Sequence, residues 1–368
     1  MSRKEAAPAE GEDTSSRRSI DHFCPHEECN GHDPHHFRSN KSAVKDTTFL
    51  EEAGIFSYRT IGREERLGYP VATFQEFNLL INRMANRKAS GEDKMPADLF
   101  KKAPEIFRKR AMAIVKLILT GHYKCKPADL KTRVILICND ASNPELISNY
   151  WPIALYNACY QLVNIIITSR LKGLVERYSV LESLQFGFRN SRAVQLVIQK
   201  ANRLIQEAMK NDSTLIRVDL DFKNAFNSVS YSCLWTILEG FGVPDIWLLK
   251  NIYENSSMRV QVGGEGTAAI QLDTGTVQGS VLSPLLFDLF INALLRLLDS
   301  TGISHKVGNA PEWNHLAFAD DLSLYTENKA DADTLLRLVQ HFQEWREVAC
   351  NGSLIRQRGP KRQNNSQC

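Results

Sequence analysis

Carboxylate side chains gather at two points of this sequence where apolar runs end. Phe318–Asp321 reads Phe-Ala-Asp-Asp between Leu316 and the run Leu322–Tyr325, which predicts two short strands with paired aspartates at their turn. Upstream, Ile216–Phe226 predicts a strand with Asp221 at its end. Adjacent ionised carboxylates repel each other unless a cation lies between them, so the pattern points to a metal site.

Neither stretch is decisive alone, because a single Asp-Asp pair is more often a solvated turn. Between the two lies Gln278–Phe287, in which a glycine turn opens an apolar helix. The ordered set of three motifs is therefore more specific than any one of them.

The elements that must position these residues follow from hydrophobic spacing. Apolar residues at helical spacing predict helices that begin near 73, 104, 160, 234 and 282, and alternating apolar runs predict a strand over 133–137. A hairpin is expected where 258–262 and 268–272 flank a Gly-Gly pair.

Bulk composition indicates a globular intracellular chain. The 368 residues are 43% hydrophobic and 24% charged, with no apolar run long enough for a membrane helix and no secretory signal in the polar start. Eight scattered cysteines suit a reducing compartment, the cytoplasm or the nucleus. A net charge of +3 is mild and does not by itself indicate nucleic-acid binding.

The amino-terminal residues 1–47 are polar and charge-rich, which predicts a disordered tail. Within them, Cys24, Cys29, His32 and His35 or His36 could bind zinc, but their spacing matches neither a zinc finger nor a retroviral zinc knuckle. We favour an unstructured histidine-rich segment and keep the zinc site as the alternative.

The three motifs resemble those of reverse transcriptases from non-LTR (LINE-like) retrotransposons, which are related to group II intron reverse transcriptases. Asp221–Phe226 is similar to the first palm motif of that family, and Gln278–Phe287 is similar to its template-and-nucleotide motif. Phe318–Asp321 resembles its Tyr-x-Asp-Asp box. The similarity runs from near Lys88 to near Trp345 and so covers most of the chain.

The resemblance implies an α+β fold with the fingers and palm of a right-hand polymerase, the palm being an antiparallel sheet backed by helices. We expect this fingers and palm domain over 118–350, after a helical extension over 48–117. The basic segment 351–368 shows no hydrophobic pattern, so it is predicted to be disordered. A thumb is accordingly expected to be absent or truncated.

The activity that the resemblance implies is RNA-directed DNA synthesis, in which deoxynucleoside triphosphates are added to a DNA primer on an RNA template. Two Mg²⁺ ions, with Mn²⁺ as an alternative, would assist the in-line attack on phosphate. The implied metal ligands and catalytic residues are Asp221, Asp320 and Asp321, with the backbone carbonyl of Phe222 as a further ligand. Asp219 lies on the same strand face as Asp221, but the match selects Asp221, and Asp219 is expected to be structural or exposed.

The resemblance also implies substrate contacts. The residues implied to contact the nucleotide are Arg133, Phe226, Gln278 and Gly279. The residues implied to contact the template are Gln185, Gly187 and Arg189. The ring of Phe226 would exclude a ribose 2′-hydroxyl, and a core phenylalanine is a compatible alternative. For Arg189 a solvated surface charge is an equal alternative. No membrane partner is implied, and the sequence does not indicate an oligomeric state.

Two departures from the family pattern bear on activity. Asn139 and Trp151 stand where a lysine and an arginine are usual, and losing cations that face a triphosphate weakens its binding. With the missing thumb pattern, they suggest a truncated or partly degenerate copy. The alternative function is therefore a catalytically decayed or co-opted reverse transcriptase-like protein that still binds nucleic acid. An unrelated two-metal nuclease would leave Gln278–Phe287 unexplained.

Overall fold

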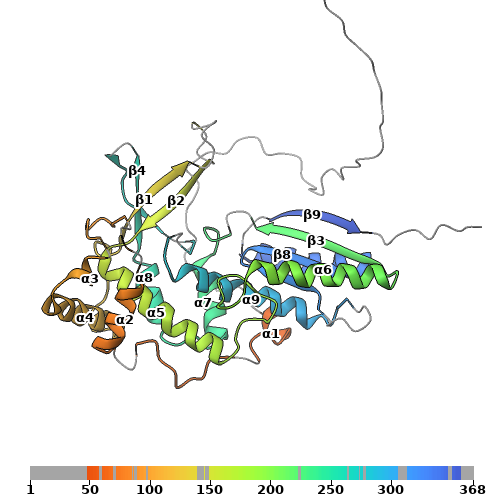
Figure 1. Ribbon diagram of the computed structural model, residues 1–368, viewed down its shortest axis with the longest axis horizontal. Helices are drawn as coiled ribbons and strands as arrows, with labels where there is room; N and C mark the ends of the chain where they lie inside the picture. Colours follow the sequence, from red (N-terminus) through yellow and green to blue (C-terminus); the bar gives the residue numbers. More distant parts are fainter. Residues whose placement is uncertain are drawn as a thin grey trace, which may run out of the picture. The chain divides into compact units, whose positions relative to one another are not determined.

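The structure is a computed structural model that describes residues 48–57, 60–68, 72–84, 86, 89–96, 98–138, 145, 149–222, 225–262, 265–272, 274–276, 279–305, 313–346 and 350–357 (Figure 1). All of these residues belong to one unit, Val44–Cys368. Three predictions fall outside them: the tail over 1–47 with its zinc alternative, the role of Asn139 and the role of Gln278.

Helices form the first described part of the chain. Thr73 caps α2 by accepting a hydrogen bond from the Glu76 amide, and Pro104 stands directly before α4, which ends at Leu119. Phe77, Leu80 and Ile81 make up the buried face of α2, as their spacing predicts. The four helices are α1 Thr48–Glu52, α2 Phe74–Arg83, α3 Leu99–Lys102 and α4 Glu105–Leu119.

The first sheet has the order β2-β1-β4-β5, and β6 also pairs with β4. β1 pairs antiparallel with β2 and parallel with β4, whereas β5 and β6 both fold back antiparallel on β4. Met258 faces Ile270 across the β4–β6 pair, so the predicted hairpin is confirmed. The strands are β1 Lys131–Cys138, β2 Tyr150–Leu155, β4 Ser257–Val262, β5 Glu265–Gly266 and β6 Ile270–Gln271.

The second sheet carries the aspartates and has the order β7-β8-β3-β9 (Figure 1). All of its neighbouring strands are antiparallel. The strands are β3 Leu215–Phe222, β7 His315–Phe318, β8 Asp321–Thr326 and β9 Cys350–Gln357.

β9 differs from the prediction of a disordered tail over 351–368 in its first part, 351–357. Residues 350–357 pair in continuous antiparallel register with β3, from Phe222↔Cys350 to Leu215↔Gln357. The free edge of β3 offers a row of backbone donors and acceptors, and a partner strand satisfies them whatever its net charge. Residues 350–357 therefore form the edge strand of this sheet beside β3. Residues 358–368 lie outside the described part.

Helices cover both faces of this second sheet. Alternate residues Ile216, Val218, Leu220 and Phe222 belong to a large apolar core with α9 and α10. On the opposite face, Leu215 packs in a smaller cluster with α6 and β7. The helices of this part are α5 Ala158–Arg177, α6 Val194–Lys210, α7 Tyr231–Gly240, α8 Ile246–Tyr253, α9 Ser283–Ser300 and α10 Lys329–Arg346.

The predicted α+β class, with an antiparallel sheet backed by helices, is confirmed. Among the described helices, none is both long enough and apolar enough to span a bilayer.

Candidate active site

The two aspartate motifs meet at one end of the second sheet. β3 and β8 pair so that Asp221 lies directly opposite Asp321, and Phe318 of β7 also faces Asp321. Asp320 lies in the turn between β7 and β8, directly after Ala319, whose backbone has a positive φ of 56°. Strand pairing therefore brings the backbones of the three predicted aspartates to the same end of the sheet.

The carboxylates share the face of the sheet that α6 covers in part. Arg217, Asp219 and Asp221 alternate with the core residues of β3 and open into a cleft of about 440 Å³. Val194 and Val197 of α6 form its far wall. Asp221 and Asp321 both line this cleft.

Burial and the repulsion between neighbouring carboxylates raise the pKa values of two aspartates at this end of the sheet. Partial burial raises the pKa of Asp320, and the charges of Asp321 and Asp221 raise it further, against a lowering effect from its own backbone amide. Burial and the charges of Asp221 and Asp219 likewise raise the pKa of Asp321. The site is short of positive charge, which is the condition that a bound cation relieves.

Among the described side chains, no three carboxylate, imidazole or thiol groups lie close enough together to form a ready metal cluster. The donor set nevertheless fits a divalent ion: oxygen atoms only, on adjacent strands, with like charges that disfavour ionisation. Phe222 is buried at the end of β3, with its side chain in the core.

Asp219 has neighbours on its own and the adjacent strand that satisfy one of its carboxylate oxygens. Its Oδ1 accepts hydrogen bonds from Arg217 Nε at 2.8 Å and from Ser323 Oγ at 2.6 Å. These contacts agree with a structural role for Asp219.

Phe226 lies beyond β3, half-buried beneath the open end of the sheet. Its ring stacks on Phe287 of α9 with centroids 4.6 Å apart, and Phe188 meets it edge-on at 6.0 Å. The ring is therefore packed against the core, as the core alternative predicts, and the nucleotide contact of Phe226 remains a prediction.

Gly279 has a backbone requirement that explains its residue type. Its φ is +108°, and an added β-carbon would lie 2.4 Å from the carbonyl oxygen of Ala154 in β2. No other residue fits this close approach between the loop before α9 and the first sheet.

Arg133 of β1 is held by contacts within the protein. Its Nη2 donates to the Ser90 carbonyl at 2.8 Å, and its Nη1 donates to Gln261 Oε1 at 3.4 Å. Trp151, on the neighbouring strand β2, is 56% exposed. A nucleotide contact by Arg133 remains a prediction.

The three predicted template residues all make contacts within the protein. Gln185 is fully buried, and an added β-carbon at Gly187 would lie 2.3 Å from the amide nitrogen of Ala319. Gly187 is thus a glycine because it packs against the aspartate turn. Both residues are buried beside the aspartate turn, and a template contact by Gln185 or Gly187 remains a prediction.

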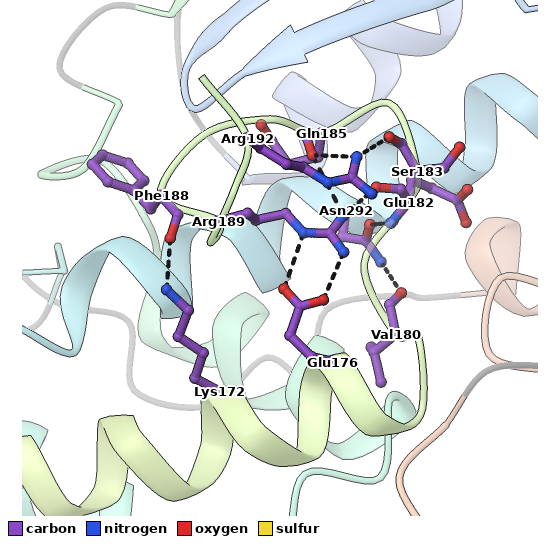
Figure 2. Close-up of polar contacts among 10 residues, drawn as sticks. All are labelled: Lys172, Glu176, Val180, Glu182, Ser183, Gln185, Phe188, Arg189, Arg192 and Asn292. Atoms are coloured by element: carbon purple, nitrogen blue, oxygen red, sulfur yellow. Dashed lines mark hydrogen bonds and ion pairs between the residues drawn. The ribbon is translucent and has the colours of Figure 1, made fainter. Parts of the chain in front are cut away.

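Arg189 is also turned inward, as Figure 2 shows. Its guanidinium forms a two-point ion pair with Glu176 of α5, at 3.1 and 2.9 Å, and only 8% of its side chain is exposed. Its Nη1 donates to the Glu182 carbonyl at 2.8 Å. The alternative of a solvated surface charge is therefore wrong for Arg189, whereas a template contact by this residue remains a prediction.

Sequence reasoning missed the partners of this loop, Glu176 and Lys172. Lys172 is half-buried and Glu176 is exposed on α5, and no local spacing distinguishes them from charges that are solvated. Their pairing with a loop that follows the helix is visible only in the folded chain (Figure 2).

Comparison with known proteins agrees with this geometry. Residues 140–352 match the family model for reverse transcriptase (RNA-dependent DNA polymerase). The matched region spans most of the chain, including the first sheet in part, the second sheet and the aspartate turn. The chain therefore belongs to the reverse transcriptase family.

The similar proteins come from non-LTR retroelements. The chain is 30% identical over 238 residues to the "Retrovirus-related Pol polyprotein from type-1 retrotransposable element R2" of Popillia japonica, a match covering 64% of this chain and 32% of that protein. It is 24% identical over 279 residues to the "RNA-directed DNA polymerase from mobile element jockey" of Drosophila melanogaster, a match covering 75% of this chain and 30% of that protein. The chain thus spans about a third of the length of these relatives.

Proposed function

We propose that this chain carries the polymerase centre of a retroelement reverse transcriptase, which adds deoxynucleotides to a DNA primer on an RNA template. The proposal is supported by the position of Asp221 opposite Asp321, which directly follows Asp320, in a chain of the reverse transcriptase family. In this reading, the second sheet is the palm, and the first sheet with α5 belongs to the fingers.

The three aspartates and the Phe222 carbonyl would hold two Mg²⁺ ions, which when bound activate the primer hydroxyl and stabilise the leaving oxygen. The chain's own contribution is placement. β3 and β8 hold Asp221 opposite Asp321, and the Ala319 turn directs Asp320 toward the same end. The aromatic ring of Phe226, supported by Phe287, forms a wall against which a deoxyribose can lie.

The test is primer extension on an RNA template with Mg²⁺, comparing the full chain with Asp221→Asn and Asp320→Asn. Each substitution keeps the side-chain size and removes a charged ligand, which we expect to lower the rate by on the order of 100-fold or more. Asp333→Asn, an exposed carboxylate on α10, is the matched control and should leave the rate unchanged. Equal rates for wild type and Asp320→Asn would overturn the assignment.

Asp219→Asn provides a stricter control, because it changes a carboxylate on the same strand face. Its hydrogen bonds to Arg217 and Ser323 predict lower stability with extension retained. Loss of extension in Asp219→Asn together with retention in Asp221→Asn would exchange the roles of the two residues.

A second candidate is nucleic-acid binding without catalysis. Trp151, exposed on β2 where the family pattern has an arginine, favours it, because an indole can stack on a base but cannot neutralise a triphosphate. Template binding by the wild type with no extension at any Mg²⁺ or Mn²⁺ concentration would select this candidate.

A further inference from the structure

The loop 182–192 reaches the aspartate turn through one fully buried side chain, Gln185. Its Oε1 accepts the backbone N–H of Ala319 at 3.0 Å, and its Nε2 donates to the carbonyl of Ala319 at 3.3 Å. The same Oε1 accepts the Gly187 amide at 2.8 Å. One side-chain amide therefore holds both polar backbone groups of the residue that precedes Asp320.

Ala319 needs this support because its backbone is left-handed, with φ of 56°, a conformation that disfavours any residue with a β-carbon. The backbone beside Gln185 adds two more bonds to β7: the Phe186 amide donates to the Ala317 carbonyl at 2.9 Å, and the Ala317 amide donates to the Leu184 carbonyl at 3.0 Å. The turn is thus fixed by residues far from it in the sequence.

The loop that carries Gln185 is itself held from two helices, as Figure 2 shows. From α5, Lys172 donates to the Phe188 carbonyl at 2.9 Å, and Glu176 pairs with Arg189. From α9, Asn292 accepts the Glu182 amide at 2.7 Å and donates to the Val180 carbonyl at 2.9 Å. Arg192 adds hydrogen bonds to carbonyls of the loop, including that of Ser183. Gln185 is therefore presented on a rigid support.

We infer that Gln185 is a positioning residue for Asp320: its amide fixes the Ala319 turn so that the Asp320 carboxylate is directed at the metal site of the proposed polymerase. The inference rests on the proposed function. Gln185 touches neither substrate nor metal, and acts only through the backbone of the ligand-bearing turn. Groups that orient metal ligands in this way typically contribute about 10- to 100-fold to metal affinity or activity.

The test compares Gln185→Met, which keeps the length of the side chain and removes both of its hydrogen bonds to Ala319, with the matched control Asn314→Leu. Asn314 is equally buried and uses its amide to donate to the Leu298 and Ile303 carbonyls, both at 2.8 Å. It lies directly before β7, at the opposite end of that strand from Asp320. Both variants should lose stability, so unfolding alone does not discriminate between them.

Two readouts do discriminate. We expect Gln185→Met to raise the Mg²⁺ concentration for half-maximal primer extension, and the dissociation constant for Mn²⁺ measured by water-proton relaxation, by about 10- to 100-fold. Asn314→Leu should change neither. Amide hydrogen exchange at Ala319 and Asp320 should accelerate in Gln185→Met and stay unchanged in the control.

The outcomes separate the inference from the proposed function. A wild-type chain that extends primers and binds Mn²⁺, with a Gln185→Met variant that binds Mn²⁺ equally well, would overturn the inference alone. Equal Mn²⁺ weakening in both variants would assign Gln185 a general structural role and likewise overturn it. A wild-type chain that neither binds Mn²⁺ nor extends a primer would overturn the proposed function and this inference together.

Discussion

Replacing Arg189 by methionine separates two roles for this residue that lead to opposite measurements. A template contact would leave the folded chain as stable as before and weaken nucleic-acid binding. The structure instead uses the guanidinium to join α5 to the loop 182–192, through Glu176 and the Glu182 carbonyl (Figure 2). Arg189→Met keeps most of the aliphatic volume and removes these bonds.

The expected loss can be worked out from the contacts. Charge-assisted hydrogen bonds contribute about 1.5–3 kcal/mol when they are buried. The Glu176 side chain is 39% exposed, so water can replace part of what it loses, and we assign about 2 kcal/mol to the pair. Loss of the hydrogen bond from Arg189 to the Glu182 carbonyl should lower the free energy of unfolding by about 1 kcal/mol more. We therefore expect the free energy of unfolding to fall by about 3 kcal/mol.

The assay is urea unfolding at neutral pH, with Arg177→Met as the matched control. Arg177 lies on the same helix as Glu176 and forms a comparable ion pair with Glu65 at 3.0 Å, but its side chain is 67% exposed. Removing this exposed ion pair should lower the free energy of unfolding by about 0.5 kcal/mol or less. Burial of the arginine is the main difference between the two pairs.

Acid titration provides a second signature. The hydrogen bond from Arg189 is the first cause that lowers the pKa of the Glu176 carboxyl, ahead of the opposing effect of burial. Since the folded pKa lies below the unfolded one, this stabilisation is complete above the unfolded pKa and is lost as pH falls through the folded pKa. In Arg189→Met, that acid-dependent loss should shrink. A variant as stable as wild type, with weaker and less salt-dependent template binding, would refute this reasoning and restore the template role.

Three further predictions concern other parts of the chain. Burial lowers the pKa of His315 to about 3, whereas the pKa in the unfolded chain is near 6.5. The contribution of the neutral imidazole to stability is therefore complete above the unfolded pKa and is lost as the pH falls below it. Urea unfolding should show that the free energy of unfolding falls by about 2 kcal/mol between pH 7 and pH 5. His315→Gln should flatten this dependence, and an unchanged slope would contradict the assignment. Gly279→Ala should cost about 2–3 kcal/mol in thermal unfolding, because its β-carbon meets the Ala154 carbonyl at a positive φ, whereas Gly173→Ala, which has open space within helix α5, should be neutral or stabilising. If the proposed function holds, Phe226→Val should increase ribonucleotide incorporation relative to deoxynucleotides in primer extension; an unchanged ratio would leave Phe226 with a core role only.

Local patterns in the sequence were sufficient for most of the elements. The 3.6-residue spacing of apolar residues located α2, α4 and α9, and alternation located β3 and β8 with Asp221 and Asp321 at their ends. These patterns are reliable because each helix or strand must bury one face. The spacing of the apolar residues on that face is set within a single short segment of the sequence. The α+β class follows from the same information.

Burial of polar side chains followed no such rule. Gln185 and Arg189 have the composition of a surface loop, and only their distant partners, Ala319 and Glu176, show that they point inward. A polar side chain can be buried when its hydrogen bonds are satisfied, and the groups that satisfy it are chosen by the packing of the whole chain. For this reason the internal contacts of this loop could not be predicted from its sequence.

The sequence by itself determined the identity and order of the aspartates, the glycine-opened helix between them and the periodicity of the strands and helices. The tertiary structure alone decided that Asp221 lies opposite Asp321, that β9 completes the sheet beside β3, and that Gln185 holds the turn before Asp320. The physical reason is range: side-chain periodicity is a property of neighbouring residues, whereas strand register and the satisfaction of buried polar groups depend on segments that only folding brings together.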